Sequence, residues 1–182
     1  ALTTAATNGD EVYLISPAMF LIAAGKPLIF SALANYTEAA TNVAGVFIGL
    51  MNSVGVNSVT STGPKANFSG AGFFKASGST TWNVIYSDGT TQTSAALTSS
   101  VTTNKTTYTA PGSTDQLLEL EIDVKTSSLL DVVFKINGTP LYKMTDRTYA
   151  SAAAMSACAG VLAGSAAAQA LNINAMAAHQ RV

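Results

Sequence analysis

Leu118-Glu119-Leu120-Glu121-Ile122-Asp123-Val124 and Asp131-Val132-Val133-Phe134-Lys135-Ile136-Asn137-Gly138 place an apolar residue at every second position. This period of two predicts two half-buried strands, each with one face on a core and one face in solvent. We expect Phe134 and Ile136 to be buried, and Asp131 and Lys135 to be exposed. Asn137-Gly138 stands directly before the apolar residues 141–144 and predicts a hairpin turn, because a type I′ turn needs positive φ at both positions.

Short strands separated by turns are expected along the rest of the chain. Apolar or alternating runs cover residues 12–16, 28–36, 43–51, 68–76, 81–87, 155–162 and 169–176. Many short strands of this kind indicate an all-β sandwich. Residues 150–154 and 166–170 are rich in Ala, which favours helix, but both stretches are too short for a stable one. Little helix is therefore expected, at most one turn in the first stretch.

The chain length of 182 residues fits one domain. We expect residues 10–182 to form a single sandwich and residues 1–9 to form a polar N-terminal arm. Residues 90–112 are rich in Thr and Ser and poor in apolar side chains. They predict a long edge excursion or loop, and residues 90–111 together with the arm are the candidate contact elements.

The composition is poor in charge and rich in hydroxyl groups. Only 10% of the residues are charged, the net charge is −1, and 23 Thr plus 18 Ser give 41 hydroxyl side chains. A nucleic-acid partner is excluded, because phosphate neutralisation needs clustered Lys and Arg. No apolar run reaches the roughly 18 residues of a membrane span, so no membrane partner is expected. Weak self-repulsion suits a protein that joins an assembly.

Glu121-Ile122-Asp123-Val124 resembles the first four positions of a retaining glucanase signature. Such a signature continues into a second Glu, whereas Lys125 or Thr126 stands there in this chain. Retaining chemistry needs two carboxyl groups about 5–5.5 Å apart, and without the second Glu the pair is incomplete. We therefore predict a solvated strand face at Glu119, Glu121 and Asp123, no catalytic residue and no enzymatic activity.

The remaining reactive side chains predict neither a cofactor site nor a metal site. Cys158 stands among small and apolar neighbours and is expected to be a buried, inert thiol. His179 lies close to the last residue of the chain and is expected to be an ordinary surface residue. Five aspartates occur singly in or near turns, and a calcium ion between two such turns is the less favoured alternative. They are Asp10, Asp88, Asp115, Asp131 and Asp146.

Three aromatic residues, Trp82, Tyr86 and Tyr36, are the candidates for a sugar-binding platform. Trp82, Val84 and Tyr86 share one face of a predicted strand. Aromatic rings in sandwiches mostly fill the interior, so a place in the core is the preferred interpretation and a sugar platform the alternative.

The order and spacing of many short segments resemble one family of proteins. The segments are Gly25-Lys26-Pro27-Leu28-Ile29-Phe30, Asn35-Tyr36-Thr37-Glu38-Ala39, Val46-Phe47-Ile48-Gly49-Leu50-Met51, Ser69-Gly70-Ala71-Gly72-Phe73-Phe74-Lys75 and Val133-Phe134-Lys135-Ile136-Asn137-Gly138. Together with the lone Trp82 and residues 148–152 and 160–165, they resemble tailed-bacteriophage virion proteins that have a laminin-G-like, concanavalin A-like sandwich. The resemblance runs from Asp10 to about Gln180, and no single motif in it is chemically diagnostic.

This resemblance implies a jelly-roll β-sandwich and a structural role on the phage particle. The expected function is that of a capsid decoration (cement) protein or minor capsid protein on the virion surface. Its expected partners are the major capsid protein and further copies of this chain, as a dimer or trimer. The alternative function is a lectin-like carbohydrate-binding module on the virion surface or on a tail fibre, with a glycan as the partner.

Overall fold

The computed structural model describes residues 1–38, 43–97, 114–149 and 153–180, in which there are strands and no helix. The strands are β1 (Leu2–Thr3), β2 (Glu11–Ile15), β3 (Leu28–Thr37), β4 (Ala44–Met51), β5 (Val59–Thr60), β6 (Gly63–Pro64), β7 (Ser69–Lys75), β8 (Asn83–Asp88), β9 (Gln92–Ala96), β10 (Gln116–Val124), β11 (Leu129–Ile136), β12 (Thr139–Thr148), β13 (Ser156–Ala163) and β14 (Ala170–Gln180). The all-β prediction is confirmed, and the predicted strands agree with the observed ones to within a few residues.

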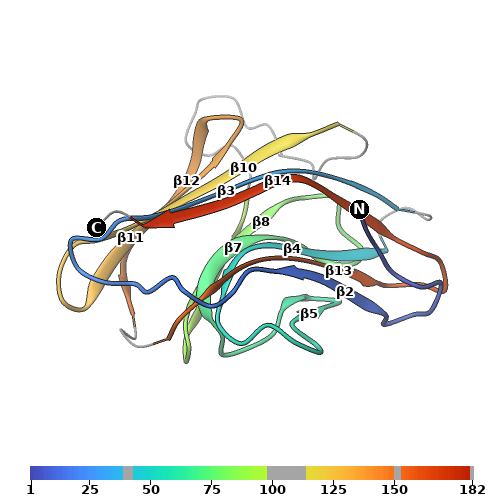
Figure 1. Ribbon diagram of the computed structural model, residues 1–182, viewed down its shortest axis with the longest axis horizontal. Helices are drawn as coiled ribbons and strands as arrows, with labels where there is room; N and C mark the ends of the chain where they lie inside the picture. Colours follow the sequence, from blue (N-terminus) through green and yellow to red (C-terminus); the bar gives the residue numbers. More distant parts are fainter. Residues whose placement is uncertain (39–42, 98–113, 150–152, 181–182) are drawn as a thin grey trace.

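Two antiparallel sheets of six strands each pack face to face (Figure 1). The upper sheet has the order β1-β14-β3-β10-β11-β12, and the lower sheet has the order β2-β13-β4-β7-β8-β9. Contacts between β13 and β14, between β3 and β4, and between β1 and β2 bring corresponding sides of the two sheets together. The small β5–β6 hairpin lies below the lower sheet, on its outer face (Figure 1).

The predicted hairpin at Asn137-Gly138 joins β11 to β12. Asn137 has a φ of 51° and Gly138 a φ of 77°, as the turn type requires. Phe134 and Ile136 are buried, which confirms that they face the core. Lys135 is only half-buried, because its side chain lies across the outer face of the sheet toward Glu121.

Asp131 is buried, so the prediction that it is exposed is wrong. The register of β11 with β12 shifts between Leu130 and Val132, and this irregularity brings the amide N–H of Asp146 to 3.2 Å from Asp131 Oδ1. The Nζ atoms of Lys143 and Lys125 lie 2.7 and 3.2 Å from Asp131 Oδ2. Strand periodicity places Asp131 on the outer face correctly, but it cannot show that two lysines and a bulge cover the carboxylate.

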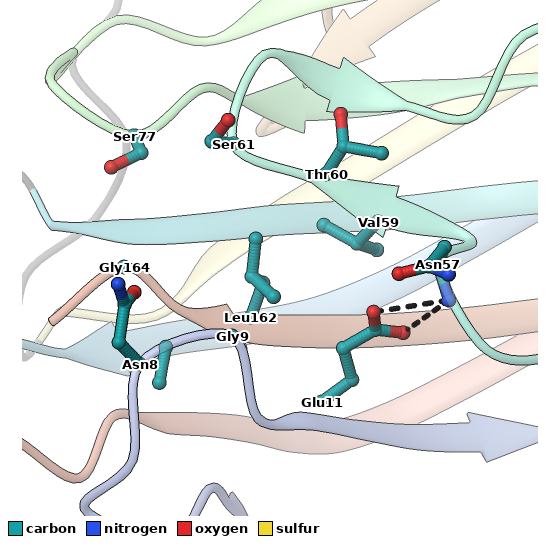
Figure 2. Close-up of a pocket in the computed structure, with 11 residues that line it drawn as sticks. Asn8, Gly9, Glu11, Asn57, Val59, Thr60, Ser61, Ser77, Leu162 and Gly164 are labelled. Atoms are coloured by element: carbon teal, nitrogen blue, oxygen red, sulfur yellow. Dashed lines mark hydrogen bonds between the residues drawn. The ribbon is translucent and has the colours of Figure 1, made fainter. Parts of the chain in front are cut away.

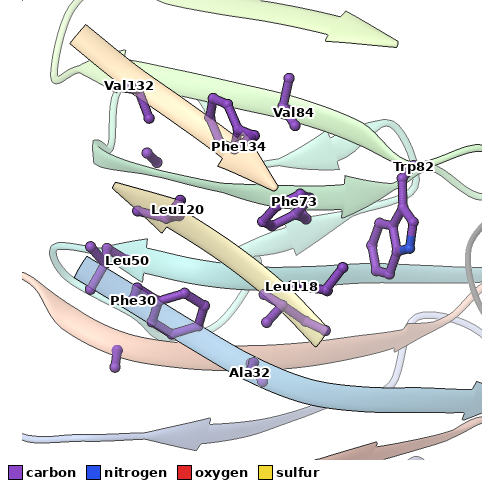
Figure 3. Packing of buried hydrophobic residues seen from close by; sticks show 14 of the residues in the cluster. Phe30, Ala32, Leu50, Phe73, Trp82, Val84, Leu118, Leu120, Val132 and Phe134 are labelled. Carbon is purple, nitrogen blue, oxygen red and sulfur yellow. The ribbon is translucent and has the colours of Figure 1, made fainter. Parts of the chain in front are cut away.

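The main core fills the space between the sheets (Figure 3). At its centre the ring of Phe73 meets two others edge to face, with centroids 6.3 Å from Trp82 and 5.4 Å from Phe134. Such T-shaped pairs add to the stabilisation that burial alone gives. Trp82 is fully buried, and its indole N–H donates a hydrogen bond of 2.9 Å to Gln116 Oε1.

A second, smaller core lies between the outer face of the lower sheet and the β5–β6 hairpin. It consists of Phe47, Met51, Val59, Phe68, Phe74, Ile85, Cys158 and Leu162. Gly72 makes room for it, because a Cβ there would stand 2.6 Å from the ring of Phe47. The Gly70-Ala71-Gly72 segment therefore serves strand packing. This second core holds the hairpin in place.

Several terminal and loop segments depart from the simple sandwich. The N-terminal arm lies along the upper sheet, since Leu2 and Thr3 pair with Leu171 and Ala170. Within the predicted edge excursion, residues 92–96 form the edge strand β9, and residues 98–111 of this candidate contact element lie outside the described residues. The same holds for residues 150–152, while residues 166–170 contain no helix. In the described part of the chain, no helix is long and apolar enough to cross a membrane.

Candidate functional site

The three aromatic candidates for a sugar platform lie inside the molecule. Trp82, Tyr86 and Tyr36 are 0%, 2% and 6% exposed. The hydroxyl group of Tyr86 donates a hydrogen bond of 2.8 Å to the carbonyl of Thr148. The preferred interpretation as core residues is confirmed, and these rings are closed to a sugar.

The carboxylates of β10 lie on the outer face of the upper sheet, as the alternation predicts. Glu119 and Glu121 are half-buried and Asp123 is exposed. Lys135 Nζ lies 3.4 Å from Glu121 Oε2, and both side chains of this pair are partly exposed to solvent. A row of strand carboxylates with one weak surface ion pair needs no catalytic explanation.

The other reactive side chains lie apart from one another. Within the described residues, no three His, Cys, Asp or Glu side chains gather in a way that could hold a metal ion. Asp10 accepts a hydrogen bond of 2.5 Å from the Ala5 amide, and Asp115 accepts hydrogen bonds from Asn35 and Asn174. Cys158 is buried as expected, and burial raises its pKa to about 12. His179 is exposed on β14.

A groove on the outer face of the lower sheet is the candidate functional site (Figure 2). Its main cavity has a volume of about 420 Å³ and is lined by Asn8, Gly9, Glu11, Asn57, Val59, Thr60, Ser61, Ser77, Leu162, Ala163 and Gly164. A second cavity of about 370 Å³ shares Gly9, Glu11 and Asn57 with it and continues along Asp10, Tyr13, Gly55 and Val56. We call these two adjoining cavities the polar groove.

Two separate parts of the chain form the walls of the polar groove. Figure 2 shows Asn8 and Glu11 on one side, Thr60 and Ser61 on the other, and Val59 between them. The first wall is fixed to β13, because the Gly9 amide donates a hydrogen bond of 2.7 Å to the Ala163 carbonyl. The second wall belongs to the β5–β6 hairpin.

Glu11 connects the two walls. Its carboxylate oxygens lie 3.0 and 2.9 Å from the backbone nitrogen of Asn57, whose N–H donates to them. The hydroxyl group of Tyr13 also donates to Glu11, and it accepts a hydrogen bond of 2.9 Å from the Val59 amide. Burial and the neighbouring Glu11 raise the pKa of Tyr13, so this hydroxyl group stays protonated and keeps donating.

Local sequence explains why the chain bends as it does at the groove. Asn57 has a φ of 61°, a conformation that Asn adopts more readily than most residues. The Thr60 side chain donates a hydrogen bond of 2.8 Å to the Gly63 carbonyl and closes the hairpin. Gly160 lets the Tyr13 ring lie directly on β13, since a Cβ at that position would stand 2.5 Å from the ring.

The lining of the polar groove is chemically suited to a neutral, hydroxylated ligand. It offers the amides of Asn8 and Asn57, hydroxyl groups and exposed backbone, and its charged side chains are the carboxylates of Asp10 and Glu11. A sugar hydroxyl can donate to a carboxylate and accept from an amide at the same time. Asp10 and Glu11 are held by hydrogen bonds to the chain itself, and no His or Cys is among the described lining residues.

Sequence reasoning singled out Asp10 and residues 1–9 for other roles and missed the remaining residues of this groove. Its residues come from positions 8–13, 55–61, 77 and 162–164, and no short motif connects them. One signal was available in the sequence. Residues 52–68 form a long, turn-rich connection between two predicted strands, and long connections in compact domains are often functional.

Comparison with known proteins relates the fold to carbohydrate-recognition domains. No protein-family model matches the chain, and no curated protein sequence matches it. Among solved structures, the Emp47p carbohydrate recognition domain aligns with a TM-score of 0.68 and 8% identity, covering 99% of this chain and 82% of that one. The Ca²⁺-bound exoplasmic/lumenal domain of VIP36 aligns with a TM-score of 0.59 and 13% identity, covering 98% and 77%.

A lyase has the same fold. Endo-β-1,4-glucuronan lyase from the fungus Trichoderma reesei aligns with a TM-score of 0.56 and 6% identity, covering 97% of this chain and 78% of that one. The chain therefore has a concanavalin A-like, legume-lectin-like sandwich, and the predicted fold class is confirmed. At these identities the likeness establishes the fold alone, and the comparisons give no support to the resemblance to phage virion proteins.

Proposed function

We propose that this chain is a carbohydrate-binding module without catalytic activity, and that the polar groove holds a neutral oligosaccharide. The observation that carries the proposal is the fixed Glu11 carboxylate, which spans a groove otherwise lined by amides, hydroxyl groups and backbone. The Emp47p carbohydrate recognition domain, one of the structural neighbours, supports it through the shared fold. The described groove lining has two carboxylates and no basic side chain, so a neutral glycan fits it better than a phosphorylated one.

The absence of catalysis is part of the proposal and follows from how the carboxylates are held. Glycoside hydrolysis needs one carboxyl group to give a proton and another to attack or to activate water. In the groove, Glu11 accepts hydrogen bonds from Asn57 and Tyr13, while Asp10 Oδ2 lies 2.5 Å from the Ala5 amide. Both carboxylates are held by hydrogen bonds from the chain itself. We therefore assign them to shaping a binding site and not to proton transfer or attack on a substrate.

The test is a screen of the purified chain against an array of neutral oligosaccharides, followed by calorimetry on the best binder. Asn57→Gly keeps the positive φ and the backbone N–H that Glu11 needs, and removes only the amide that faces the groove. We expect this variant, and Glu11→Gln, to raise Kd about tenfold, the loss of one or two hydrogen bonds to the ligand.

The matched control is Glu121→Gln on the outer face of the upper sheet, which changes the same functional group far from the groove. Its Kd should equal that of the unchanged chain. Absence of binding on the array, or equal affinity of the Asn57→Gly and Glu121→Gln variants, would contradict the proposal.

A structural role on the surface of a tailed-phage particle is the second candidate function. The favouring observation is the scarcity of charge, 10% of residues, which leaves few ion pairs for any contact with a major capsid protein. Such a contact should survive a rise in salt from about 0.1 to 1 M, because the screening length then falls from roughly 10 to 3 Å and only charge–charge attraction is lost. Sedimentation of particles at both salt levels, with quantification of this chain, checks it; release at 1 M would count against it.

A further inference from the structure

One long edge of the upper sheet is open. β14 pairs with β3 from Ala170 to Gln180, but on its other side only Ala170 and Leu171 pair, with β1. Figure 1 shows β14 running along the near side of the upper sheet, and the pairing with β1 ends at Leu171. Among the described residues, no strand continues β1 along β14, so from Asn172 onward one row of backbone groups has no strand partner.

The β14 edge lacks most of the features that protect sheet edges, although its pairing with β3 has one register shift, between Ile173 and Ala175. Between Asn172 and Gln180 there is no Lys, Arg, Asp, Glu or Pro. The opposite edge, β12, carries Pro140, Lys143, Asp146 and Arg147, and its pairing with β11 has two register shifts. Charges and proline on an edge strand prevent the pairing of further strands, and β12 carries them whereas β14 from Asn172 to Gln180 does not.

The inter-sheet core is only partly covered along this open side. Ile173, Met176 and Ala178 of β14 pack against the main core and stay partly exposed. In the lower sheet, Leu14 is 40% exposed although it alternates with the outward-facing Tyr13. One more strand beside β14, with an apolar side chain at every second position, would cover these groups.

The two sheets leave room for a single strand at this position. β13 packs under β14, and β2 extends the lower sheet one strand further, under β1. A second copy of the chain paired through its own β14 would bring its β13 into the place of β2. The open stretch of the β14 edge is limited at both ends. At one end β1 pairs with Leu171, and at the other end the Gln180 side chain donates a hydrogen bond to the carbonyl of Leu21.

We propose that the edge of β14 from Asn172 to His179 is a docking site for one extended, uncharged peptide segment of a partner protein. The segment adds a strand antiparallel to β14, in line with β1, and its alternate apolar side chains cover Leu14, Ile173 and Met176. Main-chain hydrogen bonds give such an added strand affinity, and the alternate side chains give it specificity. This inference is independent of glycan binding, because the polar groove lies on the outer face of the lower sheet.

A tethered strand tests the docking site without knowledge of the partner. Because β1 runs antiparallel to β14, residues added ahead of Ala1 run along the open edge. The probe is the full chain with an added tail of alternating Val and Thr that is long enough to reach Gln180. We expect hydrogen exchange of the amides between Asn172 and His179 to slow about tenfold or more, as for strands inside a sheet.

The matched control is a tail of equal length with Pro at alternate positions, which cannot donate to the sheet and should leave exchange unchanged. Met176→Lys, which places a charge on the edge, should abolish the slowing produced by the Val-Thr tail. Slowing with the Val-Thr tail alone supports the site. Equal exchange with both tails, or slowing that survives Met176→Lys, would overturn it.

Discussion

The main core between the two sheets and the polar groove on the outer face of the lower sheet are built from very different side chains. The main core contains Phe73, Trp82 and Phe134 in edge-to-face contact and excludes solvent. The polar groove has one aromatic ring, that of Tyr13, and a few aliphatic side chains, and otherwise presents carboxylates, amides, hydroxyl groups and backbone. The difference teaches that the aromatic residues of this chain stabilise the fold, whereas recognition is assigned to small polar groups on a rigid support.

The largest expected effect is that of Phe73→Ala in the main core. The ring is fully buried and contacts both Trp82 and Phe134. Its removal should lower the free energy of unfolding by about 3–5 kcal/mol, the transfer and cavity cost of a buried Phe. Urea denaturation followed by tryptophan fluorescence measures it. Asn57→Gly in the groove is the comparison, with an expected change within about 0.5 kcal/mol; similar losses in both variants would break the contrast.

Lys75 is a fully buried charged residue beside the main core, and its replacement gives the next effect. Its Nζ atom is fully buried, 2.6 Å from Glu38 Oε1 and 2.5 Å from the Ala44 carbonyl. Burial lowers the pKa of Lys75, and Glu38 opposes this shift. Lys75→Met should cost about 3 kcal/mol, because it leaves the Glu38 carboxylate without its cation.

The double variant Lys75→Met/Glu38→Gln should recover part of this loss, since no unpaired charge remains. A double-mutant cycle by urea denaturation measures the recovery. Full stability of Lys75→Met alone would mean that the ion pair contributes nothing to the fold.

The next expected effect concerns the pH dependence of stability. We assign it to two carboxylates that lie outside both the main core and the polar groove. Burial by itself raises the pKa of Asp88, but hydrogen bonds from Thr91, Thr90 and Thr148 outweigh it and lower the pKa to about 2. The hydrogen bond from Lys143 lowers the pKa of Asp131 in the same direction. A carboxylate whose pKa is lower in the folded chain stabilises it at neutral pH, and this stabilisation is lost as the pH falls.

The unchanged chain should therefore lose stability between about pH 5 and 2, and the part due to Asp88 is at most about 2 kcal/mol. Thermal unfolding across that range should show a smaller slope for Asp88→Asn and for Asp131→Asn. An unchanged slope in both variants would show that other groups control the acid response.

A smaller effect on stability, above only that of Asn57→Gly, is expected from Tyr13→Phe, which sharpens the contrast because it acts mainly on the groove. The variant removes the hydroxyl group between the Val59 amide and Glu11 but keeps the ring on Gly160. We expect about 1 kcal/mol of lost stability and a several-fold weaker glycan affinity, since Glu11 loses one of its anchors. Denaturation and calorimetry on the same sample separate the two; a stability loss without a loss of affinity would contradict the positioning role of Tyr13.

The strands and the core could be predicted from the sequence, because both follow from local alternation. The Asn137-Gly138 hairpin and the burial of Trp82 are of this kind. The buried Asp131 could not be predicted, because its cover comes from Lys143 and Lys125 across a bulge. The groove escaped prediction for the same reason, since sheet order and not sequence proximity brings Glu11 to Asn57.

Binding of a neutral oligosaccharide in the polar groove is the central claim, and an NMR titration tests it most directly. The ligand is the best binder from the array, added to the uniformly ¹⁵N-labelled chain. The account predicts that the amides whose signals move gather at residues 8–13 and 55–61, and that Asn57→Gly reduces these shifts. Shifts centred on Asn35, Asp115 and Asn174 on the upper sheet, with the groove amides unmoved, would contradict it.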